Sequence, residues 1–315
     1  MSNKGGRVSP DYLADIAPEY AFSYDKSQVL YIIDNLCHVQ RYTPAFYLIF
    51  YNIDLVKDNI EYFTNIISNW IITNNVTQQL KTISYPLSHI ISEIDKHTPK
   101  DKCHNLLRIE ILIFSILKQH IDVSRLVISK MILEDPMFML EILKATYLND
   151  NGDIEAEIDT EISYHNYKLL DTILSHSSIN DETKLIKYCE ELVAIGEKFH
   201  YSKAAFSIIG QILGMYQEDD NYPPTAICEF IEKHNNEHLE SQYARTLFNK
   251  RSGIAHYTDD GITEKKHSEV FAKYYNKTKY MYNRISMIFK NLEKNYLWLS
   301  EKDSKDAKIR ELLDY

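Results

Sequence analysis

The feature that most constrains the fold is the helical spacing of apolar residues along nearly the whole chain. One clear series consists of Ile208, Ile209, Ile212, Leu213 and Tyr216. Side chains three and four residues apart lie on one stripe of an α-helix, which can be buried against a neighbour. No stretch alternates strictly enough between apolar and polar residues to predict a β-strand. We therefore expect an all-α fold of packed helical hairpins, arranged as a bundle or a short solenoid of helical repeats.

The last part of the chain predicts a long C-terminal helix. Beyond Gly261 the apolar series continues through Phe271, Tyr274, Thr278, Met281, Ile285, Ile288, Leu292, Tyr296 and Leu299. Because this spacing is never broken, it predicts one helix of about 35 residues.

Prolines and one acidic segment divide the helical runs. Each proline is expected to stop or start a helix, because its ring removes a backbone donor. The six sites are Pro44, Pro86, Pro99, Pro136, Pro223 and Pro224. Residues 149–160 are acidic and almost free of apolar side chains, which is typical of a solvated loop. This loop is predicted to separate an N-terminal helical layer, residues 25–150, from a C-terminal helical unit, residues 160–315.

Charge and residue usage argue against several classes of protein. The net charge of −10 is unfavourable for general binding to nucleic acid, although Arg245, Lys250 and Arg251 form a local basic cluster. Eight glycines in 315 residues, none arranged as a phosphate loop, argue against a bound nucleotide cofactor. Four scattered cysteines suit buried thiols in a reducing compartment. With no secretory signal and no long apolar run, we expect a soluble, cytoplasmic protein without a membrane partner.

A possible zinc motif lies at His234-Asn-Asn-Glu237-His238, which matches the H-x-x-E-H spacing of inverted zinc peptidases. On one helix, the two histidines could bind a metal ion while the glutamate activates water. The two asparagines between them are polar where that family buries apolar residues, and no β-sheet is predicted to hold the unit. We therefore interpret the histidines as surface residues and expect no bound metal.

One short segment carries residues that could cleave RNA without a metal ion. Arg251 and His256 are its candidate catalytic residues, and Lys250, Ser252 and Tyr257 flank them. A histidine can move a proton near neutral pH, and an arginine can stabilise the charge that develops on a phosphate. Because the chain has 12 histidines, however, a spacing this loose is also expected by chance.

The segment 247–257 resembles the R-x4–6-H motif of HEPN-type ribonucleases. The resemblance implies an all-helical, metal-independent enzyme whose site is completed across a homodimer. In that case His256 would be the acid or base and Arg251 would stabilise the transition state. Ser252 stands where the family often has Asn, Asp or His, so the polar support of the histidine departs from the family pattern.

About a third of the chain resembles the C-terminal helical region of large, poorly characterised bacterial multidomain proteins. The matching residues are Gly210–Leu213, Tyr222-Pro223, Ile231-Glu232, Asn249-Lys250-Arg251, Asp260-Gly261, Tyr296, Glu301, Asp303 and Ala307. This resemblance implies a structural role for the turn at residues 249–251 and an incidental histidine at position 256. Arg251 would then be a cation that binds the last carbonyl groups of a helix.

Two functions are therefore expected, and the first is preferred. It is a non-catalytic helical interaction or scaffold protein with a protein partner. The alternative is a HEPN-like endoribonuclease that acts on RNA through Arg251 and His256. Both resemblances imply a bacterial conflict or phage-defence setting.

Overall fold

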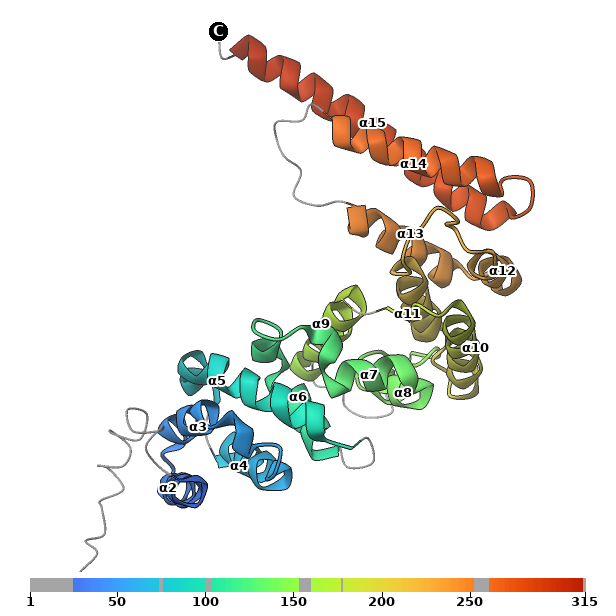
Figure 1. Ribbon diagram of the computed structural model, residues 1–315. Helices are drawn as coiled ribbons and strands as arrows, with labels where there is room; N and C mark the ends of the chain where they lie inside the picture. The colour runs from blue at the N-terminus through green and yellow to red at the C-terminus, as the bar shows by residue number, and fades with distance from the viewer. Residues whose placement is uncertain are drawn as a thin grey trace, which may run out of the picture. The chain divides into compact units, whose positions relative to one another are not determined.

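The computed structural model describes residues 25–73, 76–99, 104–152, 160–176, 178–251 and 261–313. Within these ranges the chain forms fourteen α-helices, two short 3-10 helices and no β-strand (Figure 1). The predicted all-α class is confirmed, and so are the packed helical hairpins. Among the described helices, none combines the length and the apolar character that crossing a bilayer requires.

The chain divides into two compact units, residues 1–130 and 131–315. The division falls inside helix α7 (Val127–Glu134). The acidic segment, residues 149–160, is expected to separate the two helical regions. Its middle part, residues 153–159, lies outside the described residues. The division into residues 25–150 and 160–315 therefore stays a prediction.

The first unit is built from helices that bury one apolar stripe each. They are α2 (Lys26–His38), α3 (Tyr42–Tyr51), α4 (Ile60–Thr73), α5 (Val76–His97) and α6 (His104–Leu117), with 3-10 helices at Ile53–Leu55 and Val123–Arg125. Helix α2 begins at a capping box, in which the Asp25 carboxylate accepts a hydrogen bond from the Gln28 backbone. Trp70 is fully buried, with its ring edge against Phe46. Burying a large side chain of this kind stabilises the fold by roughly 1.5–3 kcal/mol.

Pro86 does not stop a helix, so that prediction is wrong. It lies in the middle of α5 and is buried. The packing of the buried side chains around it, such as Ile83 and Leu87, compensates for the lost backbone hydrogen bond. Pro136 behaves as predicted: it is the first residue of α8 (Pro136–Lys144), directly after the capping residue Asp135.

The second unit continues from α8 through five helices that carry the candidate sites. They are α9 (Thr160–His176), α10 (Glu182–Lys198), α11 (Ser202–Gly214), α12 (Thr225–His234) and α13 (Glu237–Arg251). Helices α11 and α13 pack unusually closely. A Cβ atom added at Gly210 would lie 2.5 Å from the Leu239 carbonyl oxygen, and one at Gly214 would lie 2.7 Å from the Thr246 Cβ. Only glycine allows this approach, because any side chain would overlap the facing helix.

The C-terminal region is a hairpin of α14 (Ile262–Thr278) and α15 (Asn283–Leu313), which lie side by side (Figure 1). The expected uninterrupted helix from Gly261 onwards is therefore wrong, although α15 alone has 31 residues. The chain turns between Lys279 and Tyr282, and Met281 is exposed there rather than buried. Folding back lets α14 and α15 bury their apolar stripes against each other, for example through Phe271 and Phe289.

Candidate functional site

The structure describes two of the five residues predicted for the catalytic site. Lys250 and Arg251 form the end of α13. Ser252, His256 and Tyr257 lie outside the described residues. Whether His256 approaches Arg251 therefore stays a prediction. The basic cluster expected from the sequence is divided, because Arg251 and Lys250 both approach Glu218, whereas Arg245 lines a separate cavity together with Lys250.

Arg251 is held in a part-buried ion pair with Glu218, from the segment after α11. Its side chain is 11% exposed, and its guanidinium carbon lies 4.6 Å from the centre of the Phe271 ring. Another of its nitrogens donates to the Leu247 carbonyl oxygen at 3.5 Å, in the preceding turn of α13. A guanidinium that is paired with a carboxylate and stacked on a ring is typical of a structural contact between elements.

The Glu218 carboxylate binds three side chains from two helices. Besides Arg251, it lies 3.4 Å from the Lys250 Nζ and accepts a hydrogen bond from the Tyr274 hydroxyl at 2.8 Å. Burial raises the pKa of Tyr274, and the hydrogen bond to Glu218 raises it further. The phenol therefore stays a neutral donor. This network connects the end of α13 to α14 through one carboxylate.

His267 is a histidine of α14 that lies close to Arg251, although the sequence spacing did not point to it. Its ring centre is 5.2 Å from that of Tyr296. Burial lowers its pKa, and the nearby Arg251 charge lowers it further. The imidazole is therefore mainly neutral at pH 7, and it lies beside a cation that is already paired.

The possible zinc motif does not form a single helix face. Helix α12 ends at His234, Asn235 takes the left-handed conformation with φ of 47°, and α13 begins at Glu237. His234 lies 3.2 Å from a Glu190 carboxylate oxygen. Because the helix is broken between His234 and His238, their four-residue spacing does not bring them together. Among the described residues, no group of three or more suitable side chains could hold a metal ion.

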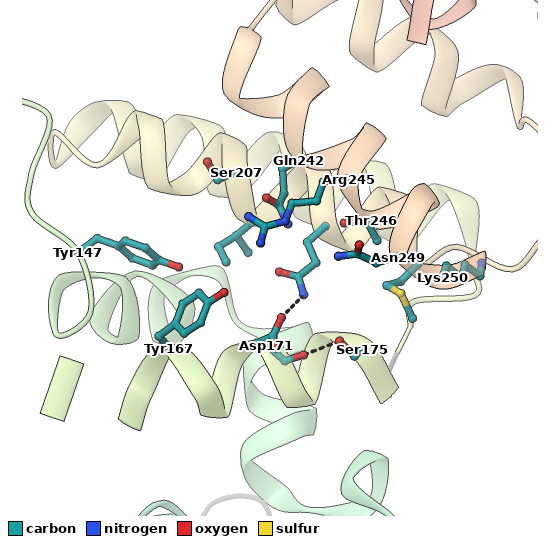
Figure 2. Close-up of a pocket in the computed structure, with 13 residues that line it drawn as sticks. Tyr147, Tyr167, Asp171, Ser175, Ser207, Gln242, Arg245, Thr246, Asn249 and Lys250 are labelled. Atoms are coloured by element: carbon teal, nitrogen blue, oxygen red, sulfur yellow. Dashed lines mark hydrogen bonds between the residues drawn. The ribbon is translucent and has the colours of Figure 1, made fainter. Parts of the chain in front are cut away.

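A hollow of about 630 Å³ opens on the second unit between α9, α11 and α13 (Figure 2). We call it the polar hollow. Its lining consists of Tyr147, Tyr167, Asp171, Ser175, Ser207, Ile208, Gln211, Met215, Gln242, Arg245, Thr246, Asn249 and Lys250. Each of the three helices contributes a row of residues four apart, which places the members of a row one turn from each other. The rows are Tyr167, Asp171 and Ser175 on α9, then Ser207 and Gln211 on α11 with Met215 directly after its end, and Gln242, Thr246 and Lys250 on α13.

The negative and the positive groups of the polar hollow lie on different helices. Asp171 of α9 accepts a long hydrogen bond of 3.4 Å from Gln211. Lys250 of α13 donates to the Tyr216 carbonyl oxygen at 2.9 Å. Arg245, one turn earlier, forms no hydrogen bond or ion pair with another described residue. Burial raises the pKa of Tyr147 to about 12, and Tyr167 and Asp171 raise it further. The polar hollow thus combines an available cation with neutral hydroxyl groups.

Sequence reasoning did not find the polar hollow, although one signal for it was present. Polar residues repeat every four positions on α9 and α13, but each such row is also typical of an ordinary solvated helix face. The rows on α11 and α13 line the same cavity only because these two helices approach closely. This approach depends on Gly210 and Gly214.

The fold and the site together define an all-α protein of helical hairpins with a polar cavity in its second unit. Comparison of the chain with protein-family models, with curated proteins and with solved structures finds no match in any of the three.

Proposed function

We propose that this chain is a non-catalytic interaction or scaffold protein, and that the exposed side of α15 binds its protein partner. The observation that carries the proposal is a row of large apolar side chains facing solvent. Met287, Trp298 and Ile309 are 47%, 61% and 53% exposed. They are spaced eleven residues apart, which is about three turns of helix, so they share one face.

Lysines accompany these apolar residues on the same side of the helix. Lys294, Lys302 and Lys305 are exposed, and helical spacing places them within about 40° of Trp298. We call Met287, Lys294, Trp298, Lys302, Lys305 and Ile309 the outer face of α15. The Lys302 Nζ lies 5.7 Å from the centre of a Trp298 ring. The opposite side of α15 packs on α14 through residues such as Phe289 and Tyr296.

The chemistry of the outer face fits an acidic protein surface that also presents apolar side chains. Exposed aromatic residues are typical anchors of protein interfaces, and lysines around them favour a negatively charged partner. The net charge of −10 for the whole chain makes a nucleic acid the poorer fit. We infer a cytoplasmic setting in bacterial defence from the resemblances and the thiols. Burial raises the pKa of Cys37 and of Cys228 to about 12, which keeps both unreactive.

The test is affinity capture from the source cells with the immobilised chain of 315 residues. We expect a protein retained by the wild type to be lost with Trp298→Ser and with the triple change Lys294→Glu, Lys302→Glu and Lys305→Glu. The matched control is Tyr280→Ser, which removes an aromatic ring that is 88% exposed in the turn before α15. A retained protein that is indifferent to the outer-face variants, or equally sensitive to Tyr280→Ser, would contradict the proposal.

The alternative function, a HEPN-like endoribonuclease, is less favoured by the geometry of Arg251. In that mechanism the guanidinium must face a phosphate, whereas here it pairs with Glu218 and stacks on Phe271. The alternative predicts RNA cleavage that persists in EDTA and disappears in both Arg251→Ala and His256→Ala. It also predicts a homodimer. Intact RNA at high protein concentration, with a monomer by light scattering, would eliminate it.

A further inference from the structure

The polar hollow has the size and the chemistry of a binding site for a small molecule. Its volume of about 630 Å³ lies within the range of small-ligand sites, roughly 300–1,000 Å³. Ile208 and Met215 are its only aliphatic or thioether side chains among the 13 lining residues. A ligand that fills it must therefore be rich in hydrogen-bonding groups rather than apolar.

Arg245 supplies the site for a negatively charged group. Its guanidinium is directed into the polar hollow (Figure 2). No described residue pairs with it, so an anion can bind there without displacing a partner from the described part of the chain. The planar guanidinium binds phosphate oxygens through two parallel hydrogen bonds. The Lys250 ammonium in the next turn of α13 adds positive charge.

Asp171 and two tyrosines supply the remaining hydrogen bonds. Asp171, on α9, can accept hydrogen bonds from ligand hydroxyl groups, since among the described residues its carboxylate accepts only the long hydrogen bond of 3.4 Å from Gln211. The hydroxyl ends of Tyr147 and Tyr167 point into the polar hollow (Figure 2). Since the raised pKa keeps Tyr147 protonated, its hydroxyl can donate to a phosphate oxygen. A carboxylate on one side and a guanidinium on the other select a ligand with hydroxyl groups at one end and an anion at the other.

We propose that the polar hollow binds a small phosphorylated polyol, such as a sugar phosphate, with its phosphate on Arg245 and its hydroxyl groups on Asp171. No histidine or cysteine is among the 13 lining residues, and the proposal assigns the carboxylate of Asp171 to the ligand hydroxyl groups, so we propose binding and no reaction. None of the residues that line the polar hollow belongs to the outer face of α15, so the two proposals are independent.

The test is isothermal titration calorimetry of the full chain with ribose 5-phosphate, glucose 6-phosphate, AMP, ribose and inorganic phosphate. We expect at least one of the two sugar phosphates to bind at least about tenfold more tightly than ribose and inorganic phosphate, as two charge-assisted hydrogen bonds imply. Preference for AMP over both sugar phosphates would overturn the polyol assignment in favour of a nucleotide. Equal binding of inorganic phosphate would overturn it in favour of a simple anion site.

Two variants and one control assign the two ends of the ligand. Arg245→Ala should remove the preference for the phosphorylated sugar, and Asp171→Asn should weaken its binding about tenfold. Arg125→Ala, which removes an exposed arginine from the first unit, should change nothing. Circular dichroism establishes that each variant is folded before titration. Unchanged binding in folded Arg245→Ala, or no binding of any sugar phosphate to the wild type, would overturn the proposal.

Discussion

Arg251 and Glu218 illustrate how single residues connect helices in the second unit. The guanidinium satisfies the carboxylate of Glu218, which also accepts from Tyr274. Removing the guanidinium would leave this part-buried carboxylate with fewer partners, and the loss exceeds the net stabilisation that the pair provides. Arg251 therefore has a structural role that is independent of any chemistry at residue 256.

Arg251→Ala should lower the free energy of unfolding by about 1–3 kcal/mol, because it leaves the Glu218 carboxylate with only Lys250 and Tyr274 and uncovers Phe271. Urea denaturation followed by circular dichroism measures the change. The control is Lys265→Ala, which removes an exposed cation from α14 and should cost less than about 0.5 kcal/mol. Equal effects of the two substitutions would show that the ion pair contributes nothing.

Glu110 is a second residue whose environment is set by the fold. It is fully buried in the first unit, and its two carboxyl oxygens accept hydrogen bonds from the Val127 and Ile128 backbones at 3.1 and 2.8 Å. Burial raises its pKa from the ordinary 4.5 to about 8, against the lowering effect of these hydrogen bonds. The folded state therefore holds a proton that the unfolded state releases between these two pH values.

This raised pKa gives a pH dependence with a definite sign. Since the folded chain binds more protons between pH 4.5 and pH 8, its stability should fall as the pH rises through this window. The glutamine side chain of Glu110→Gln cannot titrate, and its amide N–H faces one of the two backbone donors. This substitution should lower the free energy of unfolding by about 1–3 kcal/mol at pH 5. Because the wild type loses stability up to pH 8, the difference in free energy of unfolding between wild type and Glu110→Gln should vanish or change sign at pH 8 in parallel urea titrations. A constant difference would show that Glu110 does not titrate in this range.

At the scale of elements, the contact between α11 and α13 depends on glycine. Gly210 and Gly214 lie one turn apart and face Leu239 and Thr246 across the interface. The resulting closeness brings the polar rows of the two helices to the same cavity. Substitutions at these glycines should therefore affect both stability and the shape of the polar hollow.

Gly210→Ala should destabilise the chain by about 1–3 kcal/mol or more, because the added Cβ would lie 2.5 Å from a backbone oxygen that cannot easily move. The comparison is Gly152→Ala, where a Cβ meets no atom within 4 Å and only the φ of +79° opposes the side chain. This second substitution should cost about 1 kcal/mol. Thermal and urea denaturation measure the loss of stability in each variant. A larger loss in Gly152→Ala than in Gly210→Ala would contradict the close packing of α11 on α13.

At the scale of the whole molecule, the chain has two compact units, and each has a core of its own. The two tryptophans divide between them. Trp70 is fully buried in the first unit, and Trp298 is 61% exposed in the second. In a Trp298→Phe background, tryptophan fluorescence therefore reports the unfolding of the first unit alone, while circular dichroism reports the helices of both.

Adding Gly210→Ala to Trp298→Phe should separate the two signals. We expect an earlier loss of helical signal in urea, because the second unit is weakened, with the fluorescence midpoint unchanged. A fluorescence midpoint that falls together with the helical signal would show instead that the whole chain unfolds as one cooperative unit.

The class of fold could be predicted from the sequence alone, because helical spacing of apolar residues is a local property that each segment displays separately. The sequence also placed the capped start of α8 at Asp135 and Pro136. It could not show that α14 and α15 are two helices, since the apolar spacing continues through the turn at Lys279–Tyr282. Nor could it show that α5 continues through Pro86, where packing outweighs local preference.

The tertiary structure alone decided which side chains share a site. The sequence grouped Arg245 with Arg251 because they are close in the chain. The structure instead pairs Arg251 with Glu218 and directs Arg245 into the polar hollow with Asp171. Residues six apart on a helix project in directions that differ by more than a right angle. Which partners they meet depends on helices far away in the sequence, and no local pattern encodes that choice.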